Sequence, residues 1–520
     1  MLLPYPVRMV LEQRVGRLVE PLTGRRWDAE ETMRHVDMRV ADYRTRGLLA
    51  GDRVFIHFGN CNEFFVELLA IWRAGGCAVP IDTGFTAFEI ETLAAWANPR
   101  LSIWKGSGEA EAMDALARLG IQTVDVTDLE ASPASNGSYG HQGIRLDDDA
   151  LILFTSGTTG QPKGVVHTHR SLRARWVSLR DHLGLDSYRR TLCLLPTHFG
   201  HGLICNCLFP WLWGCDLYVQ PPFRPELLAQ LGALVDEHEI TFMSSVPAVW
   251  RVALRISKPP ERGSLERVFL GSAPLTAQLW EDVQAWSGAS DVFNAYGITE
   301  TGSWLAGTTV PGFTPEDGLI GEAWGGVIRV LGHGEPGAPE DRASACASGE
   351  AGHVWVNTPA LMRGYLDRDD LTEKVVSNGW FITGDIGVID ERGWLYLRGR
   401  EREEINKGGM KVHPSDVDAV IERFPAATDV CAFAYPEPTL GEDVGVAVAL
   451  SSTDSKTILA LHEFTATHLA KHQMPQRWYI LDEIPRTSRG KVSRQAVAER
   501  CLASTPVNLA QLQTELCPSS

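Results

Sequence analysis

Apolar and polar positions alternate with two different periods along the first 145 residues. Apolar residues recur at the helical spacing of three or four in some stretches and gather in short β-branched or aromatic runs in others. The helical pattern covers 29–46, 63–74 and 87–97, and the strand pattern covers 53–57, 77–81 and 101–104. This alternation predicts a parallel sheet with helices on both faces.

The next stretch, 151–170, reads LILFTSGTTGQPKGVVHTHR. An apolar run, 151–154, predicts a buried strand, and a second β-branched run begins at Val165. The loop between them holds three glycines, four hydroxyl side chains and Lys163. Glycines let backbone N–H groups approach an anion, while hydroxyls and a lysine add further donors. The loop therefore predicts a phosphate site, although it is not a Walker A loop, because Pro162 precedes the lysine and Gly164 follows it.

Composition narrows the class of protein. The chain has 520 residues, too many for one hydrophobic core, and its 44% hydrophobic and 22% charged residues are ordinary for a globular protein. A net charge of −17 argues against a nucleic-acid surface and requires any nucleotide site to be locally positive. The ten cysteines form no CxxC pair, which favours reduced thiols in a cytoplasmic protein.

Two apolar segments are not predicted to enter a membrane. The first residues turn charged too soon for a signal peptide. The stretch 192–219 is strongly apolar, but it contains two histidines, an asparagine, an aspartate and two prolines, which are costly in lipid. A buried segment that lines a pocket, and no membrane span, is the expectation.

Further short motifs follow the phosphate loop in a fixed order. They are LLPTHFGHGL at 194–203, LGSAPL at 270–275, NAYGITETG at 294–302, WFITGDIG at 380–387, GREREEINKGG at 399–409 and IPRTSRGKVSR at 484–494. Together with the phosphate loop they closely resemble the signatures of the adenylate-forming superfamily, which includes acyl-CoA synthetases, peptide-synthetase adenylation domains and luciferases. The resemblance covers nearly the whole chain.

The resemblance implies a nucleotide site. ATP phosphates are expected at Thr155, Ser156, Gly157, Thr158, Thr159, Gly160 and Lys163. The adenine is expected against Gly271, Ser272, Ala273, Pro274, Asn294, Ala295, Tyr296 and Gly297, with its ring stacked on the tyrosine. Asp385 is expected to bind the ribose hydroxyls, and Arg400 the ribose or a phosphate.

The resemblance also assigns catalytic roles. Thr299 is expected to contact the α-phosphate and Glu300 to hold Mg²⁺, a hard cation suited to a carboxylate. Lys491 is expected to reach the reacting carboxylate and the α-phosphate. A nucleotide-binding regulator without catalysis would have lost one of Lys491, Glu300 and Asp385, and all three are present.

The expected acid pocket contains Phe199, His201, Val246, Gly271 and Gly297. Either Phe199 or His201 stands at the gate position of the family. No aspartate lies in 194–203 to hold an α-amino group. An apolar, aromatic or cyclic acid is therefore expected. The acceptor of the acyl group is most often coenzyme A in free-standing members, with an amine, as in coronafacate-type ligases, or a carrier-protein thiol as alternatives.

The expected fold class is α/β. Residues 1–400 are predicted to form an N-terminal adenylation domain of parallel-sheet subdomains and a small β unit. Residues 401–520 are predicted to form a mobile α+β lid, with a hinge near Arg402 and with Gly408 and Gly409 presented to the acceptor.

Overall fold

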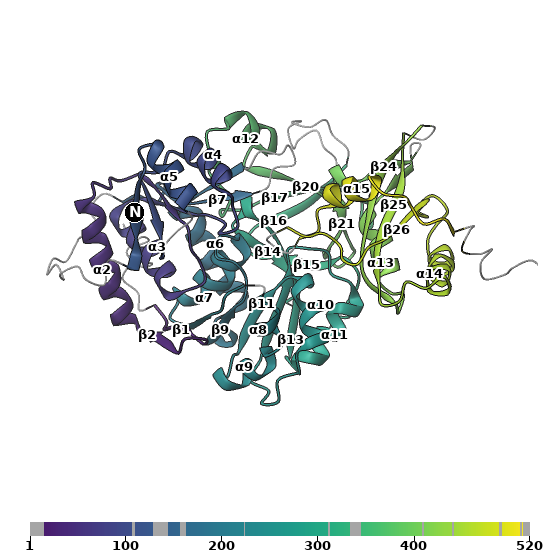
Figure 1. Cartoon of the computed structure of the whole chain (residues 1–520), viewed down its shortest axis with the longest axis horizontal. Helices are drawn as coiled ribbons and strands as arrows, with labels where there is room; N and C mark the ends of the chain where they lie inside the picture. The colour runs from purple at the N-terminus through teal and green to yellow at the C-terminus, as the bar shows by residue number, and fades with distance from the viewer. Residues whose placement is uncertain are drawn as a thin grey trace, which may run out of the picture.

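A computed structural model describes residues 15–106, 110–127, 144–155, 163–222, 224–309, 313–332, 345–407, 410–438, 441–487, 491–509 and 512. Figure 1 shows a large N-terminal part built on two sheets and a smaller C-terminal lid at one end. The predicted α/β class is confirmed, with parallel strands in both large sheets and an α+β lid.

The first sheet contains the predicted phosphate-loop strands. Its central strands β4, β3, β5 and β6 run parallel, whereas β8 returns antiparallel to β7 and β18 pairs with β8. In spatial order the strands are β18 (Gly364–Tyr365), β8 (Lys163–Thr168), β7 (Asp149–Thr155), β4 (Cys77–Pro80), β3 (Arg53–Ile56), β5 (Leu101–Trp104) and β6 (Gln122–Asp125). The helices of this half are α2 (Ala29–Thr45), α3 (Asn62–Ala74), α4 (Ala87–Ala97) and α5 (Ala110–Arg118).

Local signals account for the ends of these helices. Asp28 accepts a hydrogen bond from the Glu31 N–H before α2, and Thr86 forms a capping box with Glu89 before α4. Gly75 ends α3 in the left-handed conformation, with a φ of 91°. These caps lie where the sequence pattern places the helix ends, so the periodicity predicted the first half of the chain closely.

The second sheet joins a parallel half to an antiparallel half. The parallel half is β1 (Leu18–Glu20), β10 (Asp216–Val219), β9 (Arg190–Cys193), β11 (Phe242–Ser245), β12 (Arg267–Gly271) and β13 (Asp291–Ile298), with β2 (Arg25–Trp27) at its edge. The antiparallel half is β14 (Ser303–Gly307), β15 (Leu319–Ala323), β21 (Leu395–Arg400), β20 (Trp380–Ile389), β17 (Gly352–Asn357), β16 (Val327–Leu331) and β19 (Val376–Ser377). The small β unit expected from the sequence thus continues the parallel sheet.

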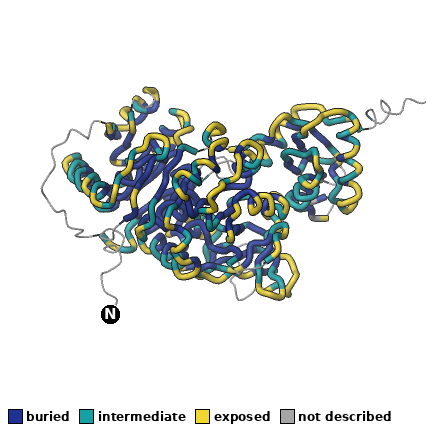
Figure 2. The backbone as a smooth tube through the Cα atoms, turned by 90° about the horizontal axis from the view of Figure 1, so that it is seen from below, coloured by how far each residue is buried: buried dark blue, intermediate teal, exposed yellow. Residues whose placement is uncertain are grey.

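Helices fill the space between and around the sheets. They are α6 (His169–Leu183), a π-helix η3 (His201–Leu208), α7 (Phe209–Trp211), α8 (Pro225–Leu228), α9 (Leu231–His238), α10 (Pro247–Ile256), α11 (Ala277–Ser287) and α12 (Asp369–Val375). Residues of α3, α6 and η3 share one buried cluster with strands of both sheets, so these helices form the layer between the sheets. Figure 2 shows this interior as buried chain in the N-terminal part.

The stretch 192–219 runs through this interior. It contains the end of β9, the π-helix and β10, and its residues are mostly buried. Within the described part of the chain, no helix combines the length and the apolar character needed to cross a membrane. The stretch is therefore part of the buried core, and its role in lining a pocket stays a prediction.

The lid has its own sheet. Its strands are β23 (Met410–Val412), β22 (Ile405–Lys407), β25 (Gly441–Leu450), β24 (Ala427–Glu437) and β26 (Arg477–Ile480), covered by α13 (Pro414–Ile421), α14 (Ser455–His468) and α15 (Arg494–Leu502). The chain leaves the second sheet at β21 and enters the lid sheet at β22, through the short 3₁₀ helix η6 (Glu401–Glu403). Arg402 lies in this connection, so the geometry is compatible with the predicted hinge, which stays a prediction.

Side chains of α10 tie the lid to the N-terminal part. Arg251 pairs with Glu422 at 2.6 Å, and Arg255 donates to the Thr428 carbonyl at 3.1 Å. Arg423 of the lid pairs with Asp317. Because these groups are partly exposed, each pair contributes at most about 1 kcal/mol.

We predict that His57 makes the fold sensitive to acid. Burial lowers the pKa of His57 to about 3, while the unfolded chain keeps a value near 6.5. The unfolded state alone therefore binds the proton below pH 6.5, and stability is lost as the pH falls from 6.5 toward 3. His57→Phe keeps the stacking on Trp104, whose ring centre is 4.0 Å away.

Between pH 7 and pH 5, the free energy of unfolding should fall by about 2 kcal/mol less in His57→Phe than in the wild type. The urea midpoints of the two proteins at each pH measure this difference. His182→Phe, on an exposed side chain of α6, is the matched control and should behave as the wild type. Equal losses in the wild type and His57→Phe would contradict a neutral buried His57.

Candidate functional site

The carboxyl ends of adjacent parallel strands form the floor of the site. In β11, β12 and β13, Ser245 pairs with Leu270, and Gly271 pairs with Ala295. Val246, Gly271 and Gly297 thus lie at or just beyond neighbouring strand ends, where ligands bind in open α/β sheets. A Cβ on Gly271 would stand 2.3 Å from the Ala295 oxygen. Close backbone packing therefore requires glycine here whether or not a ligand binds.

His201 opens the π-helix and is fixed at both ring nitrogens. The Ser244 hydroxyl donates to the Phe269 carbonyl at 3.3 Å, so it accepts from Nε2–H of His201 at 2.5 Å. Nδ1 then accepts from the Ser272 hydroxyl at 2.9 Å. Ser272 has a φ of 67°, a left-handed conformation that is uncommon for serine. The turn therefore holds Ser272 in reach of His201.

His201 carries no charge at neutral pH. Burial, together with the nearby charge of Lys491, lowers its pKa to about 3. Ser244 was missed by the sequence reasoning, because a serine in a buried strand carries no signal of a partner 43 residues away. The π-helix was missed as well, since its irregular turn produces no helical period.

Lys491 lies against Phe199, in the segment 194–203 where the acid pocket is predicted. Its Nζ is 5.5 Å from the centre of the Phe199 ring, a distance at which a cation is attracted to the ring face. The following residue, Gly200, is close to Leu153 of β7 and to Thr299, because a Cβ on it would stand 3.4 Å and 3.7 Å from their side chains. The structure thus brings Lys491 and Thr299 to the segment that carries Phe199 and His201, although these three parts of the chain are far apart in sequence.

Thr299 and Glu300 stand on the 3₁₀ turn η4 (Thr299–Thr301), directly after β13. His167 donates Nε2–H to the Thr299 carbonyl at 2.7 Å, and burial lowers the pKa of this histidine to about 4. The Tyr365 hydroxyl donates to Oε1 of Glu300 at 2.8 Å. Nζ of Lys163 lies 5.0 Å from the centre of the same tyrosine ring. Tyr365 therefore joins the predicted phosphate-loop lysine to the predicted metal ligand.

Tyr365 was not among the predicted site residues. It reaches the site because β18 pairs with β8, with Tyr365 opposite Val165. A strand of two residues is too short to show a period of alternation, so this pairing could not be predicted from the sequence. Thr155 and Lys163 face each other at the ends of β7 and β8, and the Thr155 hydroxyl donates to the Lys163 carbonyl at 3.5 Å. The predicted phosphate ligands Ser156, Gly157, Thr158, Thr159 and Gly160 lie outside the described residues.

Asp385 is shared by a tyrosine and an arginine. The Tyr296 hydroxyl donates to Oδ2 at 2.5 Å, and Nε of Arg400 lies 2.9 Å from Oδ1. Burial and the carboxylate charge raise the pKa of Tyr296 well above its usual value. A carboxylate has about four acceptor positions, so both oxygens can still accept bonds from a ligand. The three predicted nucleotide residues thus form one connected group.

The remaining predicted residues are placed as follows. Asn294 is buried and donates to the Leu319 carbonyl at 2.8 Å, so its side chain serves the fold. Ala295 is buried, Ala273 is partly exposed and Pro274 is exposed beside Ser272. Gly408 and Gly409 lie outside the described residues.

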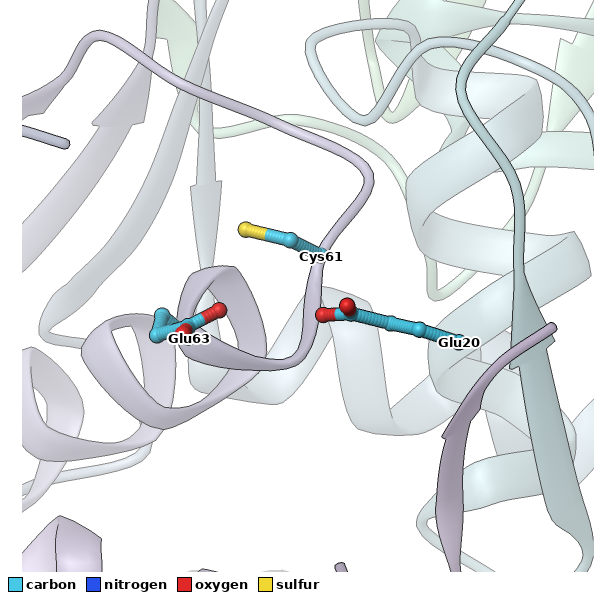
Figure 3. A group of neighbouring side chains, drawn as sticks. All are labelled: Glu20, Cys61 and Glu63. Atoms are coloured by element: carbon cyan, nitrogen blue, oxygen red, sulfur yellow. The ribbon is translucent and has the colours of Figure 1, made fainter. Parts of the chain in front are cut away.

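A separate acidic group resembles a metal site but is balanced by cations. Glu20, Cys61 and Glu63 place one potential ligand atom each within 4.8 Å of one another (Figure 3). Arg25 pairs with both glutamates at 2.5 Å, and Lys105 pairs with Glu63 at 2.8 Å. Although burial opposes it, these bonds lower the pKa of Glu63 to about 2, and burial raises that of the Cys61 thiol to about 12. We interpret the group as an ion-pair network.

A buried arginine supports the turn that carries Glu300. Arg175 of α6 is fully buried, and its guanidinium donates to the Thr301 carbonyl at 2.9 Å and to the Trp324 carbonyl at 2.8 Å. Burial lowers its pKa to about 10, which still leaves it protonated at neutral pH. The position of η4 relative to β15 therefore depends on one side chain from the layer between the sheets.

Comparisons with known proteins agree with this geometry. The family model of the AMP-binding enzyme matches residues 23–366, and that of the AMP-binding enzyme C-terminal domain matches residues 416–491. The chain is 30% identical over 472 residues to an oxalate–CoA ligase of Arabidopsis thaliana, covering 88% of this chain and 90% of the relative.

Two solved structures show the same fold. ATP-bound MatB from Rhodopseudomonas palustris has a TM-score of 0.84 at 26% identity, covering 95% of this chain and 98% of MatB. The amide bond synthetase McbA from Marinactinospora thermotolerans has a TM-score of 0.81 at 22% identity, with the same coverage of both chains. At that identity McbA is informative for the fold alone.

We predict that Arg175→Met destabilises the N-terminal part by about 3 kcal/mol or more, because it leaves buried carbonyls without donors. Urea unfolding followed by tryptophan fluorescence measures the change. Arg173→Met, on a partly exposed position of the same helix, is the control and should shift the midpoint little. Equal midpoints for the two variants would show that η4 does not depend on Arg175.

Proposed function

The chain belongs to the family of AMP-binding enzymes and is an AMP-forming acid ligase, and from this premise we propose that it activates an apolar, aromatic or cyclic carboxylic acid with ATP and transfers the acyl group to coenzyme A. In the first step a carboxylate oxygen attacks the α-phosphorus, an acyl-adenylate forms and pyrophosphate leaves. In the second step the acceptor attacks the acyl carbon and AMP leaves. The observation that carries the proposal is the approach of Lys491 to Phe199 and His201.

Lys491 supplies the positive charge for the first step. The attacking carboxylate and the α-phosphate are both negative, so their approach needs a fixed cation. Phe199 places the ammonium of Lys491 at the pocket wall, beside a histidine that stays neutral. Thr299, which the close packing of Gly200 puts at the same wall, contacts the α-phosphate.

The nucleotide spans the ends of both sheets. Thr155 and Lys163 bind its phosphates together with Ser156, Gly157, Thr158, Thr159 and Gly160. The adenine lies between Tyr296 and the 271–274 turn, and Asp385 and Arg400 bind the ribose. ATP-bound MatB, which shares the fold along nearly the whole chain, supports ATP as the nucleotide.

Glu300 fits a divalent cation such as Mg²⁺. Its carboxylate is partly exposed, and Tyr365 donates to Oε1, which orients the group and leaves further lone pairs on both oxygens. When bound there, the metal would offset the phosphate charges. Lys163 beside Tyr365 adds a second positive charge from the chain itself.

The pocket selects the acid by shape. His201 is bonded at both nitrogens and cannot turn without breaking two hydrogen bonds, whereas the Phe199 side chain is held by packing and by Lys491. We assign the gate to Phe199. Val246 and the close-packed glycines Gly271 and Gly297 leave an apolar wall, which suits an acid without an α-amino group.

Coenzyme A is the proposed acceptor because the relative matched over 88% of this chain is a CoA ligase. An amine or a carrier-protein thiol is the alternative, and the fold accommodates an amide bond synthetase equally well. The connection at Arg402, between β21 and β22, acts as the hinge about which the lid turns to admit the acceptor.

The decisive test is acid-dependent AMP release over a panel of carboxylic acids, each offered with coenzyme A or with amino acids, and with products identified by mass. We expect at least one aromatic or cyclic acid to release AMP and pyrophosphate and to yield a thioester. If the product is an amide, the acceptor is an amine and not coenzyme A. Absence of acid-dependent pyrophosphate from every acid would refute the proposal.

We predict that Lys491→Ala lowers acid-dependent ATP–pyrophosphate exchange by about 10²–10³-fold, because a fixed charge at the reacting oxygens is lost. ATP binding, measured by calorimetry, should change little, since the proposed phosphate, adenine and ribose contacts remain. Lys471→Ala, on an exposed lysine of the lid, is the control. Exchange at the wild-type rate in Lys491→Ala would remove Lys491 from the mechanism.

A further inference from the structure

A buried aspartate–histidine pair stands beside the acid pocket and has no part in the steps above. Nε2 of His198 lies 3.2 Å from Oδ2 of Asp82, and their side chains are 10% and 6% exposed. Oδ1 of Asp82 accepts from the Gly84 N–H at 3.0 Å. Asp82 follows β4 at the carboxyl end of the first sheet, so the pair bridges that sheet and the segment that carries Phe199.

The segment that carries His198 is held in place by Asn60. The Thr197 N–H donates to Oδ1 of Asn60 at 3.1 Å, and the Asn60 amide donates to the Leu195 and Gln220 carbonyls at 3.0 Å and 2.7 Å. Asn60 itself has a φ of 44°, an uncommon conformation that this network supports. His198 is therefore a positioned side chain, one residue from the ring that contacts Lys491.

The pair has the geometry of an oriented base. Nε2 and the Asp82 oxygen make a close charge contact rather than a well-aligned hydrogen bond, but a lone pair on Nε2 would face the carboxylate, so the hydrogen is favoured on Nε2 and Nδ1 keeps its lone pair. Nε2 is buried, and the exposed part of the ring thus lies away from Asp82. An imidazole held by a carboxylate in this way is suited to remove a proton from a bound nucleophile.

The second step of the proposed reaction needs such a base, whereas the first does not. A carboxylate attacks the α-phosphorus without losing a proton, but a thiol or an amine must lose one when it attacks the acyl carbon. His201 is excluded as the acceptor of that proton, because both of its ring nitrogens are already bonded.

We propose that His198, oriented by Asp82, is the general base of acyl transfer. As the acceptor sulfur or nitrogen forms its bond to the acyl carbon, its proton passes to Nδ1 of His198. The bond between the acyl carbon and the phosphate oxygen breaks, and AMP leaves with the bonding electrons. The inference rests on the proposed function and assigns a residue to its second step.

Separate measurement of the two steps tests the inference. The variants are His198→Gln, His198→Ala and Asp82→Asn, with His182→Gln as the control on an exposed histidine. ATP–pyrophosphate exchange with the best acid of the panel reports the first step. Single-turnover transfer from preformed acyl-adenylate to coenzyme A, or to a primary amine if the panel yields an amide, reports the second.

We expect exchange to stay within about threefold of the wild type in all variants. Transfer should fall about 10²-fold in His198→Gln and His198→Ala and about tenfold in Asp82→Asn. Added imidazole should restore transfer in His198→Ala, which a purely structural role would not explain. Wild-type transfer rates in both His198 variants would overturn the inference.

The measurements distinguish failure of the proposed function from failure of the inference about His198. If the wild type shows no acid-dependent exchange, the proposed function itself is wrong. If the wild type shows exchange and transfer, and the His198 variants lose both to the same extent without rescue by imidazole, only the role of His198 as a base is wrong.

Discussion

The buried guanidinium of Arg175 is the contact on which the geometry of the site depends. It donates to the carbonyl that closes the η4 turn and to the Trp324 carbonyl after β15. A charged group without water is costly unless its donors are used, so the surrounding backbone is constrained to meet them. Thr299 and Glu300 project from the turn that results. The layer between the sheets thereby fixes groups that a loop alone would leave variable.

The neutral and the positively charged side chains of the candidate site come from different helices and strands. The histidines that contact the backbone or serines of the site are neutral because they are buried, with pKa values of about 4 for His167 and about 3 for His201. Positive charge comes instead from Lys163 on β8, Arg400 on β21 and Lys491 in the lid. The positively charged side chains of the candidate site thus come from three separate parts of an overall acidic chain, one of which belongs to the lid.

The sequence predicted those helices and strands whose positions depend on local patterns of residues. Helix periods, caps and short β-branched runs located α2, α3 and α4 and the strands between them within a residue or two. Motif order indicated Asp385, Tyr296 and Lys491; in the structure Tyr296 bonds Asp385, and Lys491 lies against Phe199. Partners that fold back from distant segments were not visible: Tyr365 for Glu300, Ser244 for His201 and Asp82 for His198. Each depends on strand pairing or on an irregular turn, for which a single sequence has no period.

The antiparallel pairing of β7 with β8 has one further consequence. It sets Thr155 opposite Lys163 at the two ends of the segment 156–162. A phosphate bound at this end of the two strands would meet the Lys163 ammonium, which belongs to the N-terminal part and stays with it when the lid moves. Affinity for the triphosphate then depends on groups of the N-terminal part, and the Lys491 ammonium of the lid can serve the reaction without being needed for binding.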